Sequence, residues 1–148
     1  MAYFIAVLAR EAGTWTEHDV DLDAMGDLPE LADALRLVTG GDDPVLMVLE
    51  REDAWWALVR VDGPEDPRVF VSDLAGVRAS AYAELLEVAP EDDDPAPGTC
   101  AGDLDVLADL GTSTEALKVM CDDEWLPIDA LAAVAERAGF AEVLDSLR

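Results

Sequence analysis

Carboxylates are the side chains of this chain with the greatest capacity for chemistry, and one window, Asp19–Glu30 (DVDLDAMGDLPE), spaces them like a calcium-binding loop. Acids stand at its first, third, fifth, ninth and twelfth positions. A helix-loop-helix calcium site also requires Gly at the sixth position for its sharp turn, and that position is Ala24. Asp27 and Glu30 instead have the spacing of the N-cap and N3 residues of a helix. The window therefore predicts a junction between a strand and a helix, and no metal site.

Zinc ligands and nucleophile-base pairs would have to come from His18, Cys100 and Cys121. A structural zinc site needs four such ligands, and a Cys nucleophile needs a His beside it. His18 lies in an alternating pattern with Val20 and Leu22, which predicts a core or interface histidine. No Gly-rich phosphate loop, nucleophile elbow or dinucleotide fingerprint is present. We therefore assign no catalytic, cofactor-binding or metal-binding residue and expect a protein that is not an enzyme.

The aromatic residues are more informative about binding. Trp55 and Trp56 are adjacent in an apolar run, so they face opposite sides of a strand and predict that both sides are apolar. One Trp is expected beneath a helix, and the alternative is an exposed Trp that anchors a partner. Trp125 follows three consecutive acids, a setting that suits a basic partner. The candidate interaction residues are Trp55, Trp56, Trp125, Asp122, Asp123 and Glu124.

The charge of the chain limits its partners. The 148 residues include 34 acidic and 9 basic ones, a formal net charge of −25. Such a surface repels the phosphates of RNA and DNA, so direct nucleic-acid binding is not expected, whereas a basic protein would be attracted. Simple solubility is the alternative explanation of the charge. A further alternative is an acidic mimic of a nucleic acid that occupies the basic groove of a protein.

Cysteine usage and the opening apolar run bear on location. Two Cys form no disulfide framework, which favours a reduced, cytoplasmic protein. The run AYFIAVLA at the start lacks a preceding basic region and is too short to span a bilayer. We read it as a buried strand, and expect no membrane association.

The periodicity predicts an α+β fold with a mainly antiparallel five-stranded sheet, in the order β-β-α-β-β-β-α, and a C-terminal helical segment. Short connections between the strands favour antiparallel neighbours. The expected strands are residues 3–9, 14–22, 45–49, 55–61 and 68–72, and the expected helices of this part are residues 28–38 and 73–88.

Three segments are expected along the chain. Residues 1–88 form the α+β sheet domain, residues 89–102 an acidic Pro-rich linker, and residues 103–148 a small helical subdomain packed on the sheet domain or on a partner. Three boundary signals mark the helices of the last segment: Thr112 with Glu115 as a capping box, Pro127 at a first turn, and Gly139 at an end. The residues expected to point inward from the helix after Pro127 are Ile128, Leu131, Val134 and Ala138.

The order of these segments resembles one small family. YFIAVLAREAGTW, DLPELADALR, PVLMVLERED, WWALVRVDG, DPRVFVSDL and AERAGF are similar to segments of the actinobacterial tRNA adenosine deaminase-associated proteins, over nearly the whole chain. The resemblance implies an association with that deaminase and supplies no active-site residues. The chain also lacks the H-x-E and P-C-x-x-C signatures of the zinc deaminases, so it is not the deaminase itself.

The leading hypothesis is a non-enzymatic, cytoplasmic accessory protein whose acidic surface faces a basic protein partner. The resemblance implies that this partner is a tRNA adenosine deaminase. The nucleic-acid mimic is one alternative. The other is an enzyme or metal-dependent protein with an unrecognised site, because Asp residues that are scattered in the sequence can converge in space.

Overall fold

The computed structural model describes residues 3–11, 13–39, 44–51, 54–63, 65–86 and 99–147. It confirms the α+β class with an antiparallel sheet and C-terminal helices. The sheet has six strands in the order β2-β1-β3-β4-β5-β6, and every neighbouring pair is antiparallel. The strands are β1 (Tyr3–Glu11), β2 (Thr14–His18), β3 (Pro44–Arg51), β4 (Trp55–Asp62), β5 (Arg68–Val71) and β6 (Ala101–Gly102).

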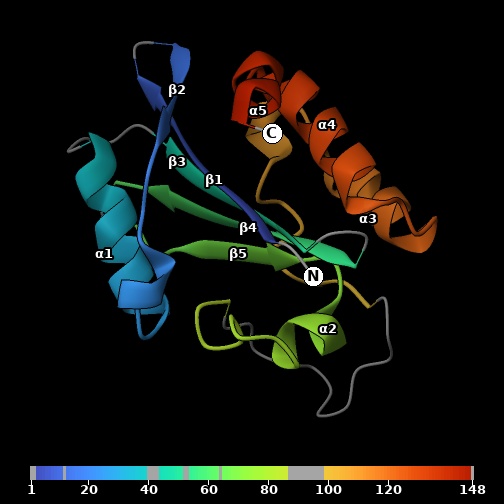
Figure 1. Ribbon diagram of the computed structural model, residues 1–148. Coiled ribbons are helices and arrows are strands. Elements are labelled where there is room, and N and C mark those ends of the chain that lie inside the picture. The colour runs from blue at the N-terminus through green and yellow to red at the C-terminus, as the bar shows by residue number, and fades with distance from the viewer. Residues whose placement is uncertain are drawn as a thin grey trace.

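Helices cover both faces of this sheet, as Figure 1 shows. The helices α1 (Leu28–Thr39) and α2 (Leu74–Arg78) pack on one face, and α3 (Thr114–Asp122), α4 (Pro127–Ala138) and α5 (Ala141–Leu147) pack on the other. Two short 3-10 turns, η1 (Leu22–Ala24) and η2 (Ala108–Leu110), lie between the longer elements. The protein thus has three layers, with the sheet in the middle.

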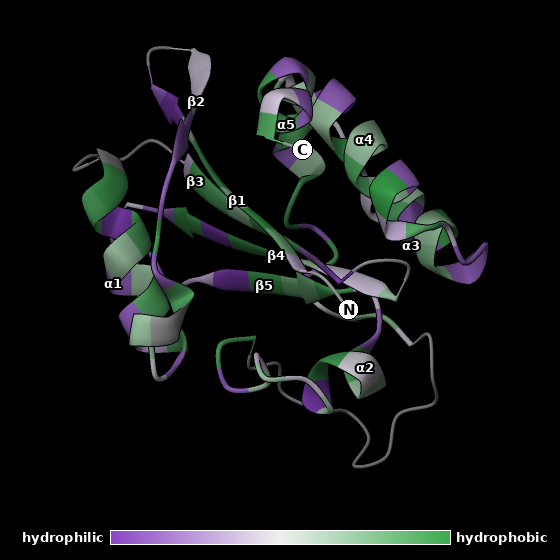
Figure 2. Ribbon diagram, in the orientation of Figure 1, coloured by the Kyte–Doolittle hydropathy of each residue, from purple (hydrophilic) through white to green (hydrophobic). Residues whose placement is uncertain are grey.

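The two cores follow from alternation along the strands. Trp56 belongs to the core beneath α3, α4 and α5, whereas Trp55 belongs to the core beneath α1 and α2. Both indoles are almost fully buried, at 2% and 1% exposure. The expectation that both faces of this strand are apolar is confirmed, and Figure 2 shows the hydrophobic residues concentrated along the central strands. Each fully buried large side chain contributes about 1.5–3 kcal/mol to folding.

Arg60 connects the C-terminal segment to the sheet. Its side chain, only 5% exposed, donates from β4 to the Val106 carbonyl at 2.8 Å and to both carboxylate oxygens of Asp109 at 2.6 and 2.8 Å. Asp62 on the same strand accepts a further hydrogen bond at 3.0 Å. The hydrogen bond from Arg60 lowers the pKa of Asp109 below its usual value. A buried cation with these partners fixes the segment before α3 against the sheet.

The sixth strand differs from the sequence-based expectation of five. Ala101 and Gly102 pair with Val71 and Phe70, within the range that we expected to be linker. Two residues carry too little periodicity to signal a strand. Residues 89–98 of the expected linker lie outside the described residues, and the division into three segments stays a prediction.

Strand and helix lengths differ at two further places. The second strand, expected to reach residue 22, ends at His18, so Asp19 and Asp21 lie beyond the strand in which the sequence placed them. The helix expected over residues 73–88 is only the five residues of α2, followed by turns to Leu86. The N-cap of α2 is Asp73, whose carboxylate accepts a hydrogen bond from the Gly76 amide at 3.2 Å. Gly has a low helix propensity, so Gly76 disfavours a longer helix here.

The helix caps were partly predicted. The amide of Glu30 donates to Asp27 at 3.0 Å, which confirms the expected start of α1. The cap of α3 is Ser113, whose hydroxyl accepts from Ala116, so the Thr112 prediction is wrong by one residue. Ser113 has the extended backbone that an N-cap requires, while Thr112 is buried.

The start and end of α4 were predicted correctly, whereas one residue predicted to point inward from this helix does not do so. Pro127 lies in the first turn and Gly139, with φ 96°, is the C-cap. Leu131 and Val134 are buried as expected, but Ile128 is 47% exposed. Because nearly half of Ile128 is exposed, its prediction as an inward residue is wrong.

Candidate functional site

A groove of about 290 Å³ opens between the sheet and the loop that joins α3 to α4. One wall comes from the loop and the helix ends, and the other comes from the start of β4 and the segment after β5. The lining residues are Ala54, Trp56, Ser72, Asp73, Met120, Cys121, Glu124, Trp125, Leu126 and Pro127.

The loop wall is held by its own backbone. Asp123 caps the end of α3, the amide of Glu124 donates to Cys121 at 3.2 Å, and the amide of Trp125 donates to Met120 at 3.0 Å. Glu124 has φ 51°, the left-handed conformation that favours Gly. This tight turn, followed at once by Pro127, presents the side chains of the loop at the surface.

The sheet wall is tied by two hydrogen bonds between neighbouring strands. The Trp56 amide donates to the Ser72 hydroxyl at 2.9 Å, and the Ser72 amide donates to the Trp56 carbonyl at 2.9 Å. Asp73 then caps α2. Ser72 and Asp73 are therefore held in place by the strand ends and the α2 cap, and they line the same groove as Trp56 and Trp125.

Apolar side chains are exposed around the groove. Trp125 is 39% exposed, and Leu126 and Val119 are about half exposed, as is Ile128. The acids Asp122, Asp123 and Glu124 directly precede Trp125 and are exposed, and among the described residues none forms an ion pair with these three. Exposed apolar side chains next to exposed carboxylates suit an apolar and basic partner surface.

The predicted interaction residues separate into two sets. Trp125 and Glu124 line the groove, whereas Asp122 and Asp123 precede them in the chain without lining it, and the role of all four in an interaction stays a prediction. Trp55 lies in the core on the other face of the sheet, and only Trp56 reaches the groove, as part of its floor. The burial of both indoles contradicts the alternative of an exposed Trp anchor on this strand, because helices cover both faces.

The sequence did not predict that Ser72 and Asp73 line this groove. Ser72 and Asp73 come from a segment some fifty residues before the loop, and only the strand pairing places them there. Asp73 carried one local signal, its position as a helix cap directly after a buried strand.

The thiols of Cys100 and Cys121 meet beside the groove. Cys100 precedes β6 and Cys121 lies in α3. Their side chains are hydrogen-bonded to each other, which lowers the pKa of Cys100 to about 7. The same hydrogen bond, together with burial, raises the pKa of Cys121. The spacing of the two residues gave no indication of this contact.

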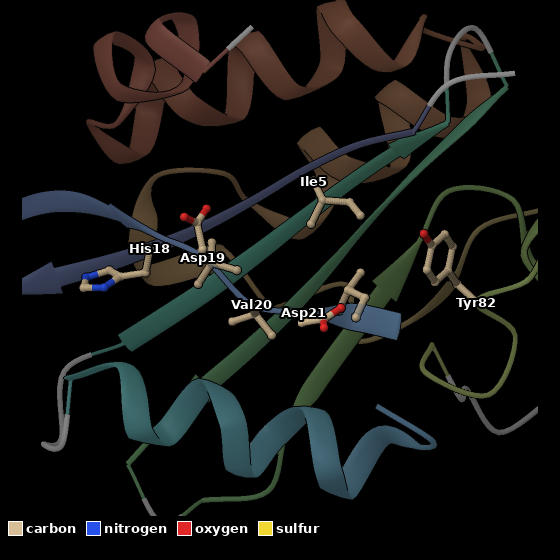
Figure 3. A pocket seen from close by; sticks show the side chains of 8 residues that line it. Ile5, His18, Asp19, Val20, Asp21 and Tyr82 are labelled. Carbon is tan, nitrogen blue, oxygen red and sulfur yellow. The ribbon is translucent and has the colours of Figure 1, made fainter. Parts of the chain in front are cut away.

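A second pocket, of about 200 Å³, contains the only histidine of the chain. His18 is half-buried and its Nε2 lies 3.1 Å from the Thr16 hydroxyl. Figure 3 shows the imidazole pointing away from Asp21 and Tyr82, which lie further along the pocket. The described residues contain no cluster of three or more His, Cys, Asp or Glu side chains that could hold a metal ion. This pocket does not bring a base to a nucleophile.

Comparison with known proteins gives the family. The Rv3753c-like tRNA adenosine deaminase-associated protein family matches residues 3–141. The chain belongs to this family. Protein Rv3753c of Mycobacterium tuberculosis is 29% identical to it over 151 residues, which cover 97% of this chain and 86% of that protein. No solved structure matches the chain.

The matched residues 3–141 include every strand of the sheet, the groove and its loop. The resemblance recognised in the sequence segments is therefore confirmed. The family's description names an association with tRNA adenosine deaminase. None of the described helices is long and apolar enough to cross a membrane.

Proposed function

We propose that this member of the family is a non-enzymatic, cytoplasmic accessory protein that binds a tRNA adenosine deaminase. The surface formed by Trp125, Leu126 and the acids Asp122, Asp123 and Glu124, hereafter the acidic loop surface, makes the contact. The observation that carries the proposal is the exposure of Trp125 and Leu126 directly after three exposed carboxylates that have no ion-pair partner among the described residues.

The chemistry of the partner supports this choice. A protein that binds tRNA presents Lys and Arg to the phosphates, and those side chains attract carboxylates on a second protein. Trp is enriched among residues that dominate interface energies, especially where a ring of polar residues excludes water. The family's description supplies the deaminase as the candidate.

Binding between the purified chain and the deaminase from the same organism tests the proposal. Calorimetric titration at low and moderate salt should detect a complex whose affinity falls as salt rises, because rim charges are screened. Trp125→Ala should weaken the complex by about 30-fold or more, as expected for an interface hot spot of about 2 kcal/mol. Inosine formation should be measured in the same mixtures.

Leu37→Ala is the matched control. Leu37 is 82% exposed on α1, on the opposite side of the sheet, so its loss should leave binding unchanged. No complex at any salt concentration, and no change in inosine formation, would reject the deaminase as partner. Equal effects of the two substitutions would reject the acidic loop surface as the contact.

A further inference from the structure

The groove beside Trp125 has the composition of a site for one cationic side chain. Aromatic and apolar side chains of Trp56, Trp125, Met120 and Leu126 line it together with the acids Asp73 and Glu124, and the Asp73 carboxylate already caps α2. Aliphatic stems pack on apolar walls while their charged heads reach polar groups, so the lining matches a long cationic side chain.

Arginine fits this lining better than lysine. A guanidinium group is planar, stacks on an indole, and donates several hydrogen bonds in a fixed fork to carboxylates. An ammonium group is compact and strongly hydrated, and gains less from an aromatic wall. Ser72 adds a hydroxyl oxygen at the same wall as Asp73.

We infer that the groove binds an arginine side chain, presented by a basic segment of the protein partner. The inference rests on the proposed function for the identity of the partner, and on the groove itself for the identity of the side chain. Trp125 stacks on the guanidinium group, and the Glu124 carboxylate accepts its hydrogen bonds.

The conformation of Glu124 supports a role for its side chain. Its φ of 51° lies in the left-handed region, where a residue with a Cβ is strained and Gly is favoured. A Glu at this position therefore lowers the stability of the turn. The carboxylate that it contributes to the groove gives a functional reason for retaining it.

Titration with short blocked peptides tests the inference without the deaminase. Acetyl-Gly-Arg-Gly-amide is added to the whole chain at low salt, and the indole N–H signal of Trp125 is followed by NMR. Matched peptides carry lysine, or citrulline, which keeps the shape of arginine without its charge. The arginine peptide should bind about 10-fold more tightly than the citrulline peptide, and more tightly than the lysine peptide.

Two substitutions at Glu124 separate binding from stability. Glu124→Gln should weaken arginine binding by about 10-fold with little change in melting temperature. Glu124→Gly should weaken it equally while raising the melting temperature by about 2 °C, because Gly relieves the left-handed strain. Glu136→Gln, an exposed acid on α4 outside the groove, is the control for net charge and should leave binding unchanged.

The outcomes separate this inference from the proposed function. Equal affinity for the arginine and citrulline peptides, or equal effects of Glu124→Gln and Glu136→Gln, would overturn the arginine site. A deaminase complex without arginine binding would overturn only this inference. Arginine binding without a deaminase complex would overturn only the choice of partner.

Discussion

At the scale of single residues, the contact between the Cys100 and Cys121 thiols shifts the pKa values of the two groups in opposite directions. Cys100 accepts the hydrogen bond and has a pKa of about 7, whereas the pKa of Cys121, the donor, is raised. The thiolate is the nucleophilic form of cysteine. The two cysteines should therefore differ in reactivity near neutral pH, although both are half-buried.

Alkylation with iodoacetamide measures this difference. The rate at Cys100 should rise as pH increases through about 7 and level off above it, because each proton lost creates thiolate. Cys121 should react slowly over the same range. At each of several pH values from about 5.5 to about 9.5, samples are taken over time and digested, and mass spectrometry of the peptides gives the alkylation rate of each cysteine.

Cys121→Ala removes the donor, so the midpoint at Cys100 should move up toward the usual pKa of about 8.5. Equal rates at the two cysteines, or a midpoint that this substitution leaves unchanged, would contradict the assignment of the hydrogen bond.

At the scale of elements, the short strand β6 depends on one glycine. Gly102 has φ 97°, and a Cβ at this position would lie 2.1 Å from the carbonyl oxygen of Val69. The next residue, Asp103, donates its amide to that same oxygen at 2.8 Å and forms an ion pair with Arg68 at 2.5 Å. A larger residue would displace this whole edge of the sheet.

Gly102→Ala should lower the free energy of unfolding by about 2 kcal/mol or more, because the left-handed backbone and the backbone clash both oppose a Cβ. Urea denaturation followed by tryptophan fluorescence measures the loss.

Gly26→Ala is the matched comparison for this substitution. Its added Cβ would come no closer than 3.7 Å to Glu30, an ordinary contact, so stability should change by less than about 0.5 kcal/mol. Similar losses for the two variants would contradict the structural role assigned to Gly102.

At the scale of the whole molecule, the net charge of −25 acts against folding. The chain has 34 acidic residues and only 9 basic ones, so most carboxylates have no basic side chain to pair with. Most carboxylates therefore repel one another across the surface of the folded chain, and the unfolded chain relaxes this repulsion by expanding.

Salt should consequently stabilise the protein. Between about 10 mM and 500 mM NaCl the Debye length falls from about 30 Å to below 8 Å, so the melting temperature should rise by several degrees. Thermal denaturation followed by circular dichroism measures the shift. KCl should act equally if screening is the cause, and a melting temperature that is constant or falls with salt would show that self-repulsion is negligible.

The sequence by itself determined features that depend on near neighbours. The Asp27–Glu30 cap, Pro127 at the start of α4 and Gly139 at its end were all predicted, because capping involves residues within one helical turn. The alternating and continuous apolar runs likewise predicted most strands and the α+β class, since a strand buried on both faces has to be apolar on both. Trp125 and its acids were predicted as interaction residues because they are consecutive, and that role stays a prediction.

Only the tertiary structure decided which distant residues meet. It buried Trp55 and Trp56 on opposite faces, left Ile128 exposed, brought the thiols of Cys100 and Cys121 together and placed Ser72 and Asp73 in the lining of the same groove as Trp125. These relations depend on strand register and on the angle at which helices pack, and no short stretch of sequence encodes either. The run of acids in the loop is visible in the sequence, but the groove that Glu124 lines exists only in the folded chain.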